Sequence, residues 1–114
     1  MSEDRCIDTW RAVHLLRRLG IPPKIAGFQY AVYGISIGIK DDRRCLSVMN
    51  WIYPEIARHY QVSAGAVESG IRSMLAKVWK ENPTGFDRMF GCKCAERLTS
   101  GDFIILAVYY LKSH

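Results

Sequence analysis

Side chains that suit the edges of DNA bases recur through residues 63–73, which read SAGAVESGIRS. Arg72 has a fork that pairs with the O6 and N7 atoms of guanine, and Glu68 has a carboxylate that accepts from the N4 amino group of cytosine. Ser63 is a good helix N-cap, and the N–H groups at the start of a helix suit a backbone phosphate. These residue types predict the second helix of a helix-turn-helix that reads DNA.

The same spacing has a second interpretation. Glu68 and Arg72 are four residues apart, in the favourable order for an ion pair on a helix surface. Such a pair contributes about 0.2–0.5 kcal/mol to helix stability. The segment would then be a packed helical hairpin with no role in DNA binding, and at this point both interpretations stay open.

Residues 53–72 have the pattern of two helices joined by a tight turn at residues 61–63. A helix-turn-helix needs a small residue where its two helices touch, and Ala57 fills that position. The predicted inner-face residues are Ile56, Tyr60, Val62, Val67 and Ile71. A helix-turn-helix is therefore expected over about residues 54–80.

The other positions of the second hairpin helix are expected to face outward. On this prediction the base-facing residues are Gly65, Ala66, Glu68, Ser69, Arg72 and Ser73. The predicted phosphate contacts lie at the end of the first hairpin helix, at the cap and before the last helix: Arg58, His59, Ser63, Lys93 and Arg97. Double-stranded DNA is the predicted partner.

The cysteines and histidines give little support to a metal site. Cys92 and Cys94 are separated by one residue, whereas structural zinc pairs usually have about two to four residues between them. His14, His59 and His114 are scattered. Two ordinary thiols are expected, with a redox switch between them as the alternative. No nucleophile motif, phosphate loop or plausible carboxylate pair is visible, so neither a cofactor nor enzymatic activity is predicted.

The chain has 114 residues, a common size for one domain, and a net charge of +5 that favours an anionic partner. The polar start MSEDRC shows no signal peptide, so a reducing cytoplasm is expected. Residues 25–39 lack charge, but they are fewer than the ~18–20 residues of a membrane span. We predict a buried central helix there, with Gly34 and Gly38 allowing another helix to approach closely.

The apolar spacing predicts a single all-α domain over residues 1–114. Helices are expected over residues 4–19, 25–40, 45–60, 64–80 and from 99 or 100 to the end, with a short helical turn at 86–90. Pro54 should break or kink the third helix. Residues 40–44 are expected to form a charged connection, and residues 81–85 to end the fourth helix.

The ends and faces of two helices can also be predicted. Gly20 should stop the first helix. The apolar positions of this helix recur with a period near 3.6: Ile7, Trp10, Val13 or His14, and Leu16. The last helix starts with a capping-box spacing at Thr99 and Asp102. It is more apolar than one core-facing stripe requires, so a self-association or protein-partner surface is an alternative to core burial for part of it.

The chain resembles the C-terminal DNA-binding effector domain of the stage-zero sporulation response regulator of endospore-forming bacteria. The similarity runs from about residue 15 through the fourth helix and continues more weakly to the end. Three motifs carry it: a GxPxxIxG pattern from Gly20 to Gly27, YPxIAxxY from Tyr53 to Tyr60, and VExxIR from Val67 to Arg72. The segment TSGDFI at residues 99–104 fits the tail.

This resemblance implies a compact bundle of about six helices with an embedded helix-turn-helix. It implies a bacterial transcription factor that binds promoter boxes, with homodimeric or tandem binding on DNA as an open question. It also places Glu68 and Arg72 on the recognition helix, facing bases. The family's regulator has a receiver domain before this one, and none is expected within this chain.

The chain departs from the resemblance on the predicted reading face. The family pattern has Arg where this chain has Ala66 and again where it has Ser69, and a Ser-Arg pair is replaced by Gly65 and Ala66. Gly65 and Gly70 also lower helix propensity, by up to about 1 kcal/mol for an interior glycine. The leading hypothesis is a sequence-specific DNA-binding domain with an altered target. The rival is a protein-interaction module of the same fold that no longer reads a specific sequence.

Overall fold

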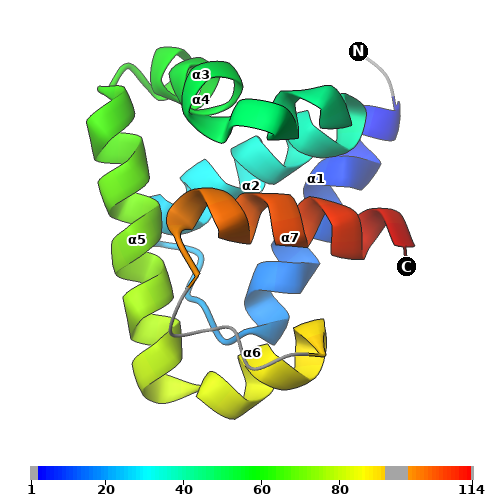
Figure 1. Cartoon of the computed structure of the whole chain (residues 1–114), viewed down its shortest axis with the longest axis vertical. Helices are drawn as coiled ribbons and strands as arrows, with labels where there is room; N and C mark the ends of the chain where they lie inside the picture. The colour runs from blue at the N-terminus through cyan, green and yellow to red at the C-terminus, as the bar shows by residue number, and fades with distance from the viewer. Residues whose placement is uncertain (1–2, 92–97, 114) are drawn as a thin grey trace.

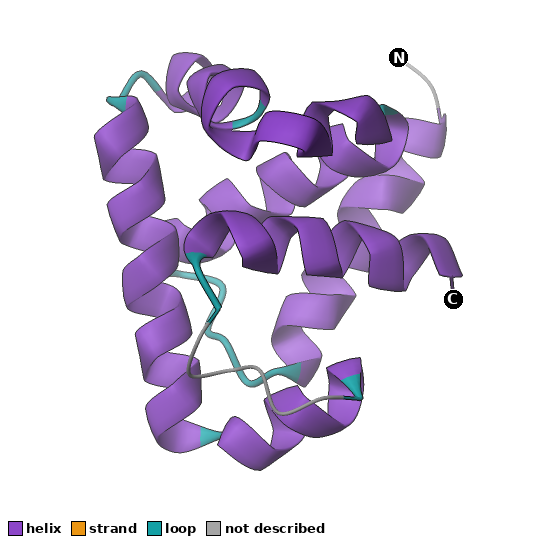
Figure 2. Cartoon of the chain, viewed as in Figure 1, coloured by secondary structure: helices purple, strands orange, loops and turns teal. Residues whose placement is uncertain are grey.

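The computed structural model describes residues 3–91 and 98–113, and all the secondary structure in these ranges is helical (Figure 2). The elements are α1 (Glu3–Arg18), α2 (Ala26–Lys40), a 3-10 helix η1 (Asp42–Ser47), α3 (Val48–Trp51), α4 (Tyr53–Tyr60), α5 (Ala64–Glu81), α6 (Pro83–Phe90) and α7 (Ser100–Ser113). The predicted all-α class is confirmed. Residues 3–91 and 98–113 contain one more α-helix than the six expected, because the segment predicted as one helix over residues 45–60 is divided.

Helix α2 forms the centre of the bundle. It packs against α1, α5 and α7, and α7 crosses in front of it in Figure 1. A Cβ atom at Gly34 would lie 2.9 Å from Cδ1 of Ile56, and one at Gly38 would lie 2.6 Å from Cγ2 of Val108. These separations are shorter than ordinary carbon contacts. The prediction of a buried central helix with close approaches at its glycines is therefore confirmed.

The face that α1 turns to the core differs from the prediction. Ile7 and Trp10 are 53% and 61% exposed, Val13 is half-buried and His14 is exposed, so only Leu16 of the predicted apolar positions is buried. The core-facing residues of α1 are Ala12, Leu15 and Leu16, and Leu19 follows the helix. The apolar spacing of Ile7 and Trp10 suits a helix but does not fix which side meets α2. Gly20, at φ +85°, does follow the end of α1 as predicted.

The segment predicted as one helix over residues 45–60 is three elements. The side chain of Asp41 accepts from the backbone N–H of Arg43, and this cap starts η1 within the expected charged connection. The helical path is interrupted at Ile52, and Pro54 lies in the first turn of α4. Proline is tolerated there because the first N–H groups of a helix have no intrahelical partner. The predicted break is thus present, two residues before the proline.

Side-chain caps also set the starts of α6 and α7. The side chain of Asn82 accepts from the N–H of Gly85 at 3.2 Å and caps α6. Residues 83–85, which were expected to end the fourth helix, therefore also begin α6. The hydroxyl of Thr99 accepts from the N–H of Asp102 at 3.1 Å, as the predicted cap of the last helix requires. Over the two ranges that the structure describes, no helix is both long and apolar enough to cross a membrane.

Candidate nucleic-acid interface

Helices α4 and α5 form the predicted hairpin, and they meet at the upper left of Figure 1. The turn between them depends on Gln61, which has a positive φ of 58°. The backbone carbonyl of Ala57 accepts from the N–H groups of both Gln61 and Val62, the latter at 3.0 Å. A glycine usually occupies this left-handed position after a helix. The predicted turn at residues 61–63 is present with glutamine in that place.

The inner faces of the hairpin largely match the prediction. Ile56, Ala57, Val67 and Ile71 are buried. Tyr60 is half-buried and meets the rings of Tyr30 and Tyr33 edge-on, at centroid distances of 5.4 and 5.9 Å.

Val62 was predicted to face inward, and this is wrong: it is 36% exposed. It directly follows the left-handed residue, where the chain has left the helical path, so the spacing of α4 no longer applies to it.

The first half of α5 presents the predicted reading face to solvent. Ser63 caps the helix, its Oγ accepting from the N–H of Ala66 at 3.0 Å. Among the six predicted base-facing residues, five are exposed: Gly65, Ala66, Ser69, Arg72 and Ser73. Because the opposite side of α5 is buried on Val67, Ile71 and Met74, the exposed residues share one face of the helix.

Glu68, the sixth predicted base-facing residue, is half-buried and has several polar partners. Nη1 of Arg72 lies 3.1 Å from Oε1 and 3.2 Å from Oε2 of Glu68. The hydroxyl of Ser100, at the start of α7, donates to Oε2 at 3.3 Å. The ion pair of the second interpretation is therefore present. The Arg72 side chain is nevertheless 64% exposed, so the ion pair with Glu68 does not remove Arg72 from the predicted reading face.

A buried tyrosine extends these contacts into the core. The hydroxyl of Tyr53, at the start of α4, donates to Oγ of Ser100 at 2.6 Å. Burial raises the pKa of Tyr53 to about 12, and the hydrogen bond to Ser100 acts in the opposite direction. Sequence reasoning treated Tyr53 as part of a motif and Ser100 as a helix start, and assigned neither a polar role. A tyrosine hydroxyl at a predicted buried position was the available signal, because such groups need a partner.

The predicted phosphate contacts are only partly within the described residues. Arg58 and His59 are exposed in the last turn of α4, and Ser63 lies at the start of α5, so these three flank the hairpin turn. The ring of His59 stacks on Tyr33 with a centroid distance of 4.3 Å. Lys93 and Arg97 lie outside the described residues.

The two glycines of α5 have different surroundings. A Cβ atom at Gly65 would meet only Oγ of Ser63, at 3.8 Å. A Cβ atom at Gly70 would lie 3.1 Å from the ring of Tyr30. A Cβ atom at Gly27, on α2, would lie 2.3 Å from the carbonyl oxygen of Gly70. Gly70 is thus part of the crossing between α5 and α2, whereas Gly65 has open space beside it.

One surface hollow has a volume of about 590 Å³ and is bordered by α1, α2, η1 and α4. Four of its charged residues form two ion pairs, Arg43 with Asp41 and Arg44 with Glu55. Within the described parts of the chain, no cluster of three or more histidine, cysteine or acidic residues has the geometry to hold a metal ion. The Cys92 and Cys94 thiols lie outside those parts.

A comparison with known protein families adds an independent finding. The sequence model of the family described as "Sporulation initiation factor Spo0A C terminal" matches residues 12–111, which is nearly the whole chain. The match spans α2 through α6 completely, together with the C-terminal part of α1 and most of α7, so it includes the hairpin and the helices that support it.

Proposed function

The chain belongs to the Spo0A C-terminal family, a family of non-catalytic, DNA-binding transcription activator domains, and from this premise we propose that it binds promoter DNA with α5 in the major groove. The observation that carries the proposal is the exposed face of the first half of α5, behind a capped N-terminus and beside the turn. A helix whose N-terminal half is packed on one face and exposed on the other suits insertion of the exposed face into a groove about 12 Å wide.

The proposed base-facing residues are those of the exposed face. Arg72 has the greatest capacity for direct reading, because its fork can donate two hydrogen bonds to one guanine. Ser69 and Ser73 are shorter hydroxyl groups on the same face, while Gly65 and Ala66 allow close approach of the helix to the bases. Glu68 reaches the same face from a half-buried position.

The proposed phosphate-binding residues are Arg58, His59 and Ser63 around the turn, together with Lys93 and Arg97. Contacts to phosphate set the position of the protein on the duplex and contribute most of the salt dependence. Arg72 is the only cationic side chain among residues 63–73. We therefore propose a target sequence that differs from that of relatives with more arginine on this helix.

Binding to duplexes tests this proposal directly. Fluorescence anisotropy with a labelled family-type promoter duplex and a scrambled duplex, over a salt series, should show tighter binding to the promoter and an affinity that falls as salt rises. Replacing Arg72 by Ala should lower promoter affinity about tenfold or more. The matched control is Arg88→Ala, on α6 at the far end of α5 from the hairpin turn, which should leave promoter affinity unchanged (Figure 1). Absence of binding to both duplexes would contradict the proposal.

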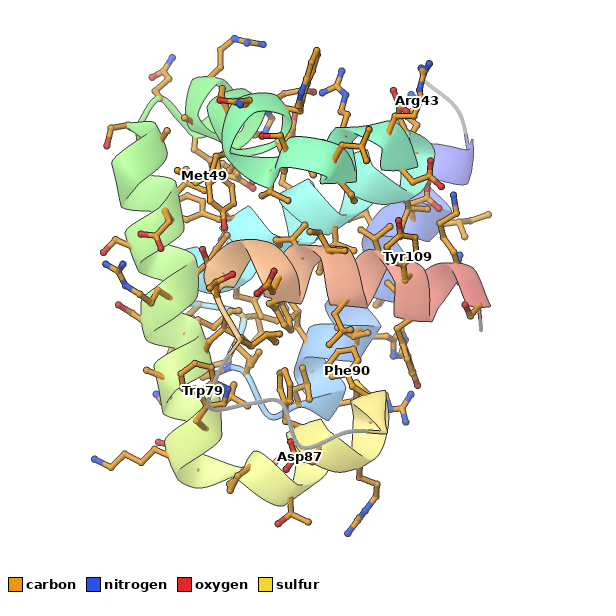
Figure 3. All side chains as sticks on the ribbon, in the orientation of Figure 1. Arg43, Met49, Trp79, Asp87, Phe90 and Tyr109 are labelled. Carbon is orange, nitrogen blue, oxygen red and sulfur yellow. The ribbon has the colours of Figure 1, made fainter. Side chains whose placement is uncertain are left out.

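The rival function is a protein-interaction module that engages a partner through the last helix. The apolar content of α7 is an argument for this rival, but more than half of its apolar residues are buried in the core: Phe103, Ile104, Ala107, Val108 and Leu111. Tyr109, which is labelled on α7 in Figure 3, is an exposed large apolar residue of this helix, at 53%.

Homodimeric or tandem binding on DNA is part of the proposal. Titrating the protein against duplexes with one and with two promoter boxes should give a doubled stoichiometry and a cooperative isotherm on the longer duplex. Independent binding to the two boxes would contradict the dimeric arrangement without contradicting DNA binding.

A further inference from the structure

We propose that Tyr53 and Ser100 are positioning residues for the reading face: they anchor the carboxylate of Glu68 to the core, and Glu68 holds the guanidinium of Arg72. This inference rests on the proposed function, since its consequence is the presentation of Arg72 to a base. It assigns a role to the start of α7 that is separate from packing.

The four residues form one continuous chain of hydrogen bonds. Tyr53 donates to Oγ of Ser100 at 2.6 Å, Ser100 donates to Oε2 of Glu68 at 3.3 Å, and Nη1 of Arg72 donates to the same oxygen at 3.2 Å. These residues come from α4, α7 and α5, and the start of α7 lies beside the middle of α5 in Figure 1. Both hairpin helices are therefore connected through a residue of a third helix.

Burial decreases along this chain from the core to the surface. Tyr53 is 0% exposed and Ser100 is 4% exposed, whereas the side chains of Glu68 and Arg72 are 27% and 64% exposed. Ser100 is the only buried polar residue identified among the described residues. A buried hydroxyl needs hydrogen-bond partners, and here Ser100 accepts from Tyr53 and donates to Glu68. The direction of donation leaves the carboxylate of Glu68 as the final acceptor.

Anchoring Glu68 changes what the surface ion pair can do. An ion pair between two exposed side chains is weak, because both side chains must be ordered for it to form. Here Glu68 is already ordered by Ser100, so Arg72 pairs with a fixed carboxylate. Both contacts to Glu68 use Nη1, so the pair does not occupy the Nη2 and Nε donors of Arg72. A preorganised arginine loses less conformational entropy when it binds a base.

The alternative explanation is that Ser100 only supports the start of α7. Thr99 provides a matched control, because its hydroxyl caps the same helix through the N–H of Asp102. Thr99→Ala removes a stabilising cap from α7 and leaves the contacts of Tyr53, Ser100 and Glu68 intact. Ser100→Ala removes the contact to Glu68. A purely structural role predicts similar effects of the two substitutions on DNA reading.

The first measurement is discrimination between the promoter and scrambled duplexes. Ser100→Ala should reduce the affinity ratio about tenfold while leaving the affinity for scrambled DNA and the salt slope unchanged. Thr99→Ala should leave the ratio unchanged. In an Arg72→Ala background, Ser100→Ala should have no further effect on the ratio, because its effect passes through Arg72. An equal loss in both backgrounds would overturn the inference.

A second variant and a second readout keep the test independent of folding and of DNA. Ser100→Cys is nearly isosteric and replaces the hydroxyl by a weak donor, so it should act like Ser100→Ala with the fold preserved. In the free protein, ¹⁵N relaxation of Nε of Arg72 should show greater mobility in Ser100→Ala and in Ser100→Cys than in the wild type or in Thr99→Ala. Unchanged mobility would overturn the inference even if DNA binding is specific. The wild type could also bind the promoter and scrambled duplexes equally while the mobility change is present. That result would contradict the proposed function and not the anchoring.

Discussion

The first turn of α5 and the place where α5 crosses α2 differ in what surrounds their glycines. Beside Gly65, in the first turn, the nearest atom to an added Cβ would be Oγ of Ser63 at 3.8 Å. At the crossing, the backbone of Gly70 comes so close to α2 that a Cβ on Gly27 would lie 2.3 Å from its carbonyl oxygen. Helix α5 thus contains a first turn with open space beside it and, five residues further on, a backbone contact that leaves no room for a side chain on the facing Gly27 of α2.

This difference separates positions that tolerate substitution from one that does not. Residues in the first turn of α5, such as Gly65 and Ala66, are exposed, so changes there leave the packing of the bundle intact. A side chain at Gly27 would instead meet the backbone of α5. Sequence reasoning counted Gly65 and Gly70 alike as losses of helix propensity, and the structure gives them different consequences.

The largest effect is expected at the crossing. Gly27→Ala should lower the free energy of unfolding by about 3 kcal/mol, because the new methyl group meets a backbone oxygen that cannot rotate away. Urea unfolding followed by circular dichroism measures this value. Gln29→Ala, at an exposed position of the same helix, is the control and should change stability by less than about 0.5 kcal/mol. If the Gly27→Ala protein is as stable as the Gln29→Ala control, the crossing of α5 and α2 does have room for an added methyl group, and the comparison fails.

The next effect concerns Tyr53, through which the reading face is tied to the core. Its pKa is raised from the ordinary 10 to about 12 by burial, so the folded state favours the neutral phenol. The unfolded state releases this proton first. The contribution of the neutral phenol to the free energy of unfolding is therefore complete below about pH 10 and is lost as pH rises from about 10 to about 12, with a total of about 2–3 kcal/mol.

Urea unfolding at several alkaline pH values measures this loss. Tyr53→Phe should abolish this part of the pH dependence, whereas Tyr109→Phe, at an exposed position, should retain it. If the two variants have the same alkaline profile, the phenol of Tyr53 is not held neutral by the fold.

A smaller effect is expected when arginine is restored to the reading face. Ala66→Arg combined with Ser69→Arg should leave the free energy of unfolding within about 0.5 kcal/mol of the wild type. Promoter affinity should rise about tenfold, which is about 1.4 kcal/mol. Anisotropy titration measures the affinity. The control is Thr84→Arg combined with Ser113→Arg, which adds the same charge at exposed positions of α6 and α7. An equal gain in the control would indicate general attraction and not groove docking.

The smallest effect compares the two glycines directly. Gly65→Ala should raise the free energy of unfolding by about 0.5 kcal/mol, because alanine loses less backbone entropy in a helix and finds open space here. Gly70→Ala should give a smaller gain or a loss, since the ring of Tyr30, at 3.1 Å from the added Cβ, must move. The difference in urea midpoint between the two variants is the measurement. A larger gain at Gly70 would reverse the comparison.

Features that depend on a few neighbouring residues were predictable from the sequence. The stop at Gly20, the turn at residues 61–63, the Ser63 cap and the glycine approaches of α2 all follow from local backbone chemistry or from helical spacing. The division of residues 45–60 was only partly predictable. Pro54 signals a boundary, but the start of η1 depends on a cap by Asp41 that the charged composition obscured.

The sequence by itself determined an all-α chain with a helix-turn-helix whose exposed face has few cations, because helix periods, caps and turns are short-range properties. Tertiary structure decided which side of α1 meets the core, why Gly27 is needed, and what holds Glu68. Tyr53 and Ser100 are 47 residues apart, and Ser100 and Glu68 are 32 residues apart. Contacts at such separations exist only once the helices have packed, because the direction in which each helix crosses its neighbours brings these side chains together.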